Sequence, residues 1–194
     1  MQRRTMPRDG SGTRAEILSV ALRLFAEQGY DKTSLREIAD EVGVTKAALY
    51  YHFRTKDDIV RAVLQDFADQ VDGIAAWMRA QAQGPERDAG FVDRMFDLIE
   101  GGGSAAMHLS RTNPTVMARE EFHELQAEPM SALLGELTGP TASADAAMRS
   151  VLAYVTVGLG SGVGAMVPVA GTPEERRAAA RAIALELLAA AREG

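Results

Sequence analysis

One stretch near the N-terminus, residues 33–56, constrains the fold more than any other part of the chain. It holds two short segments with helical spacing, separated by Gly43. Ser34 followed three residues later by Glu37 matches a capping box, which predicts the start of the first helix. Glycine adopts the left-handed conformation without a steric penalty, so Gly43 predicts the end of that helix. Thr45 then predicts the N-cap of a second helix.

The second helix, which runs from Lys46 to Phe53, has an outer face that is unusual for a helix that only meets water. Leu49 and Phe53 are four residues apart, so they share a face and are expected to pack inward. The outer positions hold a lysine, alanines, two tyrosines and a histidine. Small residues allow a close approach to DNA, and Lys, Tyr and His donate hydrogen bonds to phosphates or base edges. The pattern indicates a helix-turn-helix with a recognition helix.

Residues 13–58 resemble the DNA-binding domain of the tetracycline-repressor (TetR) family of transcriptional regulators. The resemblance is carried by ILSVALRLFAEQGYDKTS (17–34), IADEVGVT (38–45) and LYYHFRTKD (49–57). It covers roughly the first quarter of the chain. The outer face and the resemblance together predict DNA contacts by Thr33, Ser34, Thr45, Lys46, Ala47, Tyr50, Tyr51, His52 and Lys56. Lys46 and Ala47 are expected to reach base edges, whereas Tyr51, His52 and Lys56 are expected to hold phosphates.

Charge is distributed unevenly between the two parts of the chain. Residues 1–56 hold ten Lys/Arg against seven Asp/Glu, a net charge of +3, and residues 57–194 carry −9, which gives −6 in total. DNA binding depends on the local field of the docking face, so the acidic total is compatible with it. Residues 1–12 are expected to form a flexible basic arm with Arg3, Arg4 and Arg8. This arm is either disordered or touches the minor groove.

The rest of the chain shows helical spacing and no period-2 strand pattern, which predicts an all-α fold. We expect an N-terminal three-helix helix-turn-helix DNA-binding domain over residues 13–58 and a helical regulatory and dimerisation domain over 59–194. Asn113 or Thr112 is a candidate cap for a helix in which Pro129 predicts a kink or break. Thr13 and Glu16 form another candidate capping box. The expected helices span residues 13–28, 34–43, 45–53, 55–83, 88–100, 104–111, 114–137, 143–167 and 173–192.

The last two expected helices, 143–167 and 173–192, are the candidate dimer interface. Gly158, Gly160, Gly162 and Gly164 fall within the first of them. Each glycine costs a helix interior about 1 kcal/mol relative to alanine, so close helix–helix approach is the expected compensation. The TetR resemblance implies that these two helices pair with their copies to form a homodimer. Alternatively, they only close the core of one chain.

The resemblance also implies a pocket for a small effector between the helices of the regulatory domain. Methionine and aromatic side chains adapt to irregular apolar ligands. On that basis the candidate lining is Phe67, Trp77, Met95, Phe96, Met107, Phe122, Met130 and Tyr154. The alternative for each of these residues is ordinary hydrophobic core. An apolar or weakly polar small molecule is the expected effector, and it would favour one of two states of the dimer by its differential affinity for them.

Other functions have weaker support in the sequence. No catalytic motif is present, so we expect no enzyme, no catalytic residue, no bound metal and no cofactor. A metal-dependent enzyme would have to use His108 and His123 with Glu120 or Glu124. A helical adaptor that binds protein is the other alternative. The absence of Cys permits a reducing cytoplasm, and no apolar run is long enough for a membrane span or secretory signal. We therefore expect a cytoplasmic, ligand-responsive, homodimeric regulator of palindromic double-stranded DNA, more plausibly a repressor than an activator.

Overall fold

The structure is a computed structural model of the 194-residue chain that describes residues 10–101, 103–162 and 169–193. Within these ranges every regular element is a helix, as the sequence predicted. The helices are α1 (Gly10–Gln28), α2 (Leu35–Val42), α3 (Lys46–His52), α4 (Lys56–Arg79), α5 (Pro85–Glu100), α6 (Ser104–Thr112), α7 (Pro114–Met117), α8 (Glu120–Thr138), α9 (Ala144–Ser161) and α10 (Pro173–Glu193).

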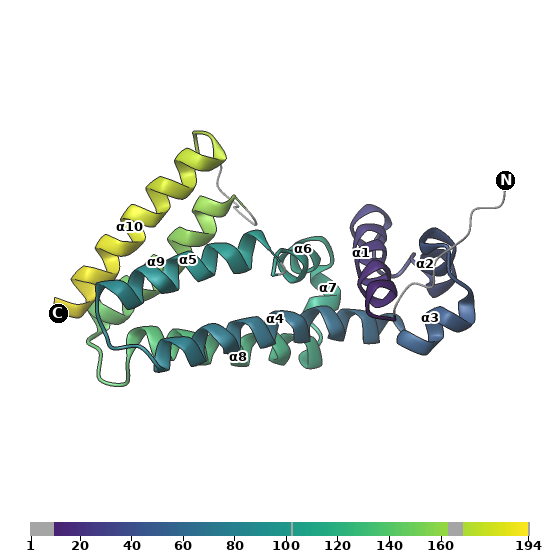
Figure 1. The fold of residues 1–194 in the computed structure, drawn as a ribbon, viewed down its shortest axis with the longest axis horizontal. Helices are drawn as coiled ribbons and strands as arrows, with labels where there is room; N and C mark the ends of the chain where they lie inside the picture. The colour runs from purple at the N-terminus through teal and green to yellow at the C-terminus, as the bar shows by residue number, and fades with distance from the viewer. Residues whose placement is uncertain (1–9, 102, 163–168, 194) are drawn as a thin grey trace.

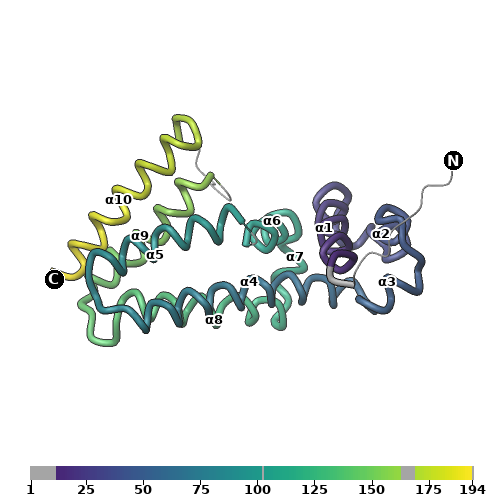
Figure 2. The backbone as a smooth tube through the Cα atoms, in the orientation of Figure 1, coloured from purple at the N-terminus to yellow at the C-terminus, as the bar shows by residue number. Residues whose placement is uncertain are grey.

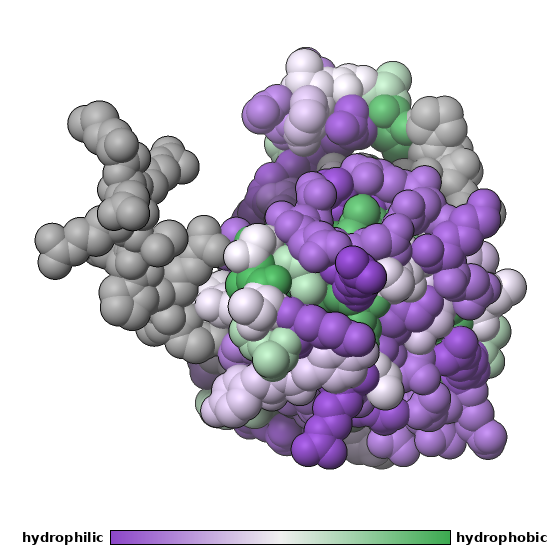
Figure 3. Space-filling model, turned by 90° about the vertical axis from the view of Figure 1, so that its right-hand side faces the viewer, coloured by the Kyte–Doolittle hydropathy of each residue, from purple (hydrophilic) through white to green (hydrophobic). Residues whose placement is uncertain are grey.

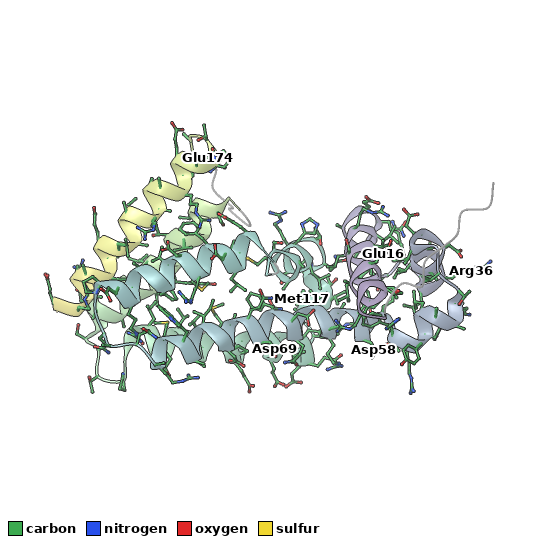
Figure 4. All side chains as sticks on the ribbon, viewed as in Figure 1. Glu16, Arg36, Asp58, Asp69, Met117 and Glu174 are labelled. Carbon is green, nitrogen blue, oxygen red and sulfur yellow. The ribbon has the colours of Figure 1, made fainter. Side chains whose placement is uncertain are left out.

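The helices form an N-terminal unit, α1–α3, at one end of an elongated body, α4–α10 (Figure 1). Helix α4 leaves the unit and runs along the body beside α8, with Asp58 in its first turn and Asp69 farther along (Figure 4). Helices α5 and α6 lie across from α4. Helices α9 and α10 pack against each other and α5, away from the N-terminal unit (Figure 2). The first turn of α4 therefore adjoins the helix-turn-helix, while its remainder belongs to the body.

The N-terminal unit has its own apolar core and the helix ends that the sequence predicted. Phe25 of α1, Ile38 of α2 and Leu49 of α3 are fully buried. The Ser34–Glu37 capping box is formed in both directions. Gly43 takes the left-handed conformation, with φ +76°, which only glycine adopts at little cost.

The start of α1 differs from the prediction. The helix begins at Gly10, so Thr13 is a buried residue within the helix and not its N-cap. The predicted capping box of Thr13 with Glu16 is therefore wrong as a helix start. The expected basic arm, residues 1–12, lies mostly outside the described residues, and its last three residues form the first turn of α1.

Several helix boundaries in the body also differ from the predictions. Helix α4 ends at Arg79, and Pro85 occupies the first turn of α5, where its missing N–H costs nothing. The helix expected over 114–137 is divided at residues 118–119 into α7 and α8. The break considered at Pro129 does not occur. Buried residues on both sides of this proline, Phe122 and Leu133 among them, hold the helical path through it.

Helix α9 ends earlier than expected, and its glycines differ in role. Gly162, with φ +70°, is the C-cap and lies outside the helix, and Gly164 falls outside the described residues. At Gly160 an added Cβ would lie 2.3 Å from the Cβ of Ala180 on α10, so the predicted close approach occurs there. An added Cβ at Gly158 would meet nothing within 4 Å. Its helix-interior cost is not offset by a close contact within the described part of the chain.

Candidate nucleic-acid interface and effector cavity

The orientation of α3 is fixed by its two ends. The hydroxyl of Thr45 accepts the backbone N–H of Ala48 at 3.1 Å, which caps the helix. Leu49 is fully buried and Phe53, directly after the helix, is nearly so, as predicted from their spacing. Since these two side chains face the core, Lys46 and Ala47 are turned outward at the N-terminal end of the helix.

The outward face of α3 carries aromatic and cationic groups. Tyr51 is 86% exposed and Tyr50 is 40% exposed. Such exposure is unusual for large aromatic side chains. The ammonium of Lys46 lies 5.3 Å from the centre of the Tyr50 ring. The Tyr51 and His52 rings meet edge to face, with 5.2 Å between their centres. The end of the molecule that holds this helix is mainly hydrophilic (Figure 3). Such a face can donate hydrogen bonds to phosphates and bases.

The hydroxyls of Thr33 and Ser34 are placed differently from one another. Thr33 is only 2% exposed, and its hydroxyl donates to the Gly29 carbonyl at 2.9 Å. It is therefore turned away from a docking surface and is not available for a DNA contact in this position. Ser34 is exposed, and its hydroxyl and backbone N–H both bind Glu37. These hydrogen bonds lower the pKa of Glu37, so the carboxylate that completes the cap stays ionised.

Lys56 points toward the N-terminal unit rather than into solvent. Its ammonium binds the Tyr30 carbonyl, lies 3.4 Å from the Asp31 carbonyl, and lies 4.2 Å from the centre of the Tyr30 ring. In this position Lys56 holds the loop between α1 and α2. A phosphate contact by this residue would require the ammonium to leave these carbonyls.

A polar joint that the sequence analysis did not find connects the N-terminal unit to the body. The Tyr30 hydroxyl donates to Asp57, and Arg119, between α7 and α8, donates to the same carboxylate at 2.9 Å. Burial, followed by the bond to Asp57, raises the pKa of Tyr30 to about 12. The Asn113 amide accepts the Tyr30 backbone N–H at 2.9 Å and donates to the Phe25 carbonyl at 3.2 Å.

Asn113 illustrates why this joint was missed. The sequence identified it only as a candidate helix cap, whereas its side chain makes no cap hydrogen bond to α7. Its partners lie more than eighty residues earlier in the chain. A contact at that separation leaves no local pattern in a single sequence.

An open cavity of about 440 Å³ lies on the body, and its volume is within the size range of small-molecule sites. Its lining includes four of the eight predicted residues: Phe67, Met107, Met130 and Tyr154. Ser110, Arg111 and Gln126 line it too and were not predicted. Helical spacing could have identified them. Ser110 and Arg111 follow Met107 by three and four residues, and Gln126 precedes Met130 by four.

The other four predicted pocket residues do not line this cavity. Met95, Phe96 and Phe122 are buried in the hydrophobic core. Trp77 is half-buried, and Arg94 stacks on its ring with 3.8 Å between the guanidinium carbon and the ring centre. Since a methionine or aromatic residue at core spacing has the same sequence pattern as a pocket residue, the two roles were not separable without the packing.

Helix α9 carries apolar side chains that the rest of the described chain leaves exposed. Met148, Leu152, Val155 and Leu159 follow at intervals of four, three and four, so they form one stripe, and each is at least 37% exposed. Ile183 of α10 is also exposed. Exposed apolar stripes of this kind mark interaction surfaces.

Within the described residues no group of three or more His, Cys, Asp or Glu side chains could hold a metal ion. His108 lies beside Arg111, and His123 is exposed on α8. Among the described helices none combines the length and the apolarity that crossing a membrane requires.

The capped helix-turn-helix with an exposed third helix, attached to a helical body, defines the class of helix-turn-helix regulators. Residues 17–63 match the family model described as "Bacterial regulatory proteins, tetR family". The match covers roughly a quarter of the chain, so it shows similarity to this family at the helix-turn-helix.

The curated relatives match part of the chain. It is 35% identical over 95 residues to the HTH-type transcriptional repressor KstR2 of Mycolicibacterium smegmatis, which covers 48% of this chain and 46% of that protein. It is 51% identical over 59 residues to the HTH-type transcriptional regulator AcrR of Shigella flexneri, which covers 30% and 27%. The chain thus spans about half or less of the length of these relatives.

Similarity to solved structures extends over the whole chain. The crystal structure of AmtR from Mycobacterium smegmatis matches with a TM-score of 0.63 and 28% identity, over 96% of this chain and 95% of that one. The body of the chain as well as the helix-turn-helix therefore shares the fold of this protein.

Proposed function

We propose that this chain is a cytoplasmic, ligand-responsive transcriptional regulator that binds a palindromic operator as a homodimer and is released by a small effector. The observation that carries the proposal is the outer face of α3, where Lys46, Tyr50 and Tyr51 are exposed on a helix whose two ends are fixed. Curated relatives of the chain are named as repressors, an activator and other transcriptional regulators.

The proposed contacts divide into two kinds. Lys46 and Ala47, at the N-terminal end of α3, face base edges in the major groove. Tyr51 and His52, together with the Ser34 hydroxyl and the start of α3 at Thr45, contact phosphates.

Two further residues support these contacts. Lys56 acts mainly by positioning the loop that carries Tyr30 and Asp31. Tyr50 supports Lys46 through the contact between its ring and the ammonium.

The proposed dimer forms through α9 and α10. The stripe of Met148, Leu152, Val155 and Leu159 would be buried against its copy, and Ile183 would extend the interface onto α10. Two copies place two recognition helices on two half-sites, which a palindromic operator requires. The alternative, in which these helices only close one monomer, leaves the exposed stripe unexplained.

The effector site in this proposal is the cavity lined by Phe67, Met107, Met130 and Tyr154. It lies between α4, α6, α8 and α9, so an occupant would touch both the helix that begins in the N-terminal unit and the helix that carries the dimer stripe. Differential affinity of the occupant for two arrangements of these helices would shift the dimer between them.

The test is selection of genomic fragments by the purified protein at stated salt, followed by footprinting of the selected fragments. We expect a protected palindrome. Tyr51→Ala should weaken binding to all sequences and reduce the salt slope by about 1, because one phosphate contact is lost. Lys46→Ala should change the preferred sequence. Arg79→Ala, a surface ion-pair residue at the far end of α4, is the control that should change neither.

Lys56→Ala is also expected to weaken binding to all sequences, through loosening of the Tyr30–Asp31 loop in addition to any lost phosphate contact. Failure to select any fragment, or identical binding by the wild type, Tyr51→Ala and Lys46→Ala, would contradict the proposed interface. In that case a helical protein-binding adaptor becomes the better interpretation.

A further inference from the structure

Arg111, in the last turn of α6, lies between two hollows of the body. It lines the cavity of about 440 Å³ that also contains Met107 and Tyr154. It also lines a second hollow of about 420 Å³ together with Ser104, Ala105, His108 and Gly162. A single arginine therefore lines both spaces, so an occupant of either one would lie near a positively charged residue.

The charge of Arg111 has no carboxylate partner among the described residues. Other arginines of the body are paired, for example Arg61 with Glu121 at 2.7 Å and Arg181 with Asp93 at 2.7 Å. The polar neighbour of Arg111 is the imidazole Nδ1 of His108, at 3.5 Å. An arginine without a carboxylate is unexpected in a part of the chain that carries a net charge of −9. It also complements the dipole of α6, but that effect would not require a cavity.

The rest of the lining combines an apolar body with a few polar groups. Phe67, Met107 and Met130 present apolar surface, and methionine adapts its shape to an irregular occupant. The Ser110 hydroxyl is bound to the Gln126 side chain at 3.2 Å. Burial raises the pKa of Tyr154, so its phenol stays protonated and can donate a hydrogen bond. The lining offers donors and a positive charge but no carboxylate.

We propose that the effector is an amphipathic carboxylate whose anionic end pairs with Arg111 and whose apolar body packs against Phe67, Met107 and Met130. This inference rests on the proposed effector role of the cavity and refines it, since it adds an anionic end to an apolar molecule. A planar guanidinium binds a carboxylate through two parallel hydrogen bonds, which a neutral amide cannot reproduce.

Calorimetric titration of the full-length protein with decanoate and with decanamide tests the anionic end. The two probes share a chain and differ in charge. We expect decanoate to bind more tightly to the wild type. Arg111→Gln should weaken decanoate binding by about 10- to 100-fold, because it removes hydrogen bonds between two charged groups. The affinity for decanamide should change little. Arg61→Gln removes the same charge from α4, outside the cavity, and is the matched control.

The apolar body is tested by the length of the probe. From hexanoate to decanoate, affinity should rise by about fourfold per methylene, the ratio that corresponds to burial of one CH₂. Equal affinity for decanoate and decanamide, equal loss in Arg111→Gln and Arg61→Gln, or no binding of either probe would overturn the proposal. Thermal melts of both variants establish that they fold.

The two proposals fail in different ways. Ligand affinity is measured without DNA, and operator selection is measured without ligand. An operator that is bound and footprinted, by a protein that shows no preference for decanoate over decanamide, would refute the carboxylate effector alone. Carboxylate binding by a protein that selects no DNA would refute the regulator and leave the ligand site in place.

Discussion

The N-terminal unit and the body differ in the sequence range of the contacts that stabilise each of them. In α2 and α3 the helix ends are fixed by groups three residues apart, such as Ser34 with Glu37 and Thr45 with Ala48. In the body, α6, α7 and α8 begin without a side-chain cap. Their positions depend on distant partners, for example Arg61 with Glu121 and Arg87 with the Glu136 carbonyl. Helices α4 and α9 of the body do begin at side-chain caps, Thr55 and Ser143. Local sequence therefore specifies the helix ends of the first region, whereas α6, α7 and α8 depend on tertiary packing.

The largest expected effect lies at the exposed stripe of the body. Val155→Asp places a charge in the centre of this stripe, so the proposed dimer should dissociate and operator affinity should fall by at least about 100-fold, because a monomer keeps only one half-site. Sedimentation and operator binding at fixed salt measure the two effects. Thr141→Asp, in the exposed loop before α9, is the control. A variant that stays dimeric would show that two copies pair through another surface.

The joint between the regions should be the next most sensitive position. Asn113→Ala leaves the buried Tyr30 N–H without its partner, while the Phe25 carbonyl keeps the Gly29 N–H, so the free energy of unfolding should fall by about 1–3 kcal/mol. Thr115→Ala changes a nearby exposed residue and should have almost no effect. Urea titrations of both variants give the comparison. A loss below about 0.5 kcal/mol in Asn113→Ala would mean that water replaces the amide at little cost.

These contacts explain how much the sequence could predict. The capping box at Ser34, the turn at Gly43 and the inward pair Leu49 and Phe53 were all predicted, because each depends on neighbours within four residues. The all-α class followed from the same short-range spacing. The joint at Asn113 was not predicted, since its partners are far away in the chain.

The candidate cavity was predicted only in part for a related reason. Phe67 and Met95 both have the spacing of buried residues, and the packing alone decides that one lines a cavity while the other lies in solid core. The polar lining was not predicted, because methionine and aromatic residue types alone were the basis of the prediction. Ser110, Arg111 and Gln126 share helix faces with Met107 and Met130, so the helical period would have included them.

The close packing between α9 and α10 predicts a smaller effect on stability. Replacement of a glycine by alanine should destabilise the fold there and stabilise it at a glycine that has no close neighbour. In Gly160→Ala the new Cβ would lie 2.3 Å from Ala180, so the helices must separate, and we expect a loss of about 1–3 kcal/mol. Gly73→Ala, in the interior of α4, meets nothing within 4 Å and should stabilise by up to about 1 kcal/mol. Thermal unfolding of both variants tests the difference. Equal shifts would show that α9 and α10 can separate freely.

The smallest expected effect belongs to the ion pair between Asp93 of α5 and Arg181 of α10. Arg181 donates two hydrogen bonds to this carboxylate, at 2.7 and 3.0 Å, and they lower the pKa of Asp93. Because the folded pKa is depressed, the pair stabilises the fold above the unfolded pKa of about 3.9, and this contribution is lost as the pH falls through the folded pKa.

Asp93→Asn should therefore be less stable than the wild type at pH 7, by under about 1 kcal/mol because the pair is partly exposed. The difference should shrink as the pH falls below 4 and then vanish, as urea titrations across this range would measure. Arg181→Gln removes the other partner and should lose the same pH-dependent component. A difference that grows toward acidic pH would mean that the carboxylate destabilises the folded state. The contact between α5 and α10 would then depend on apolar packing alone.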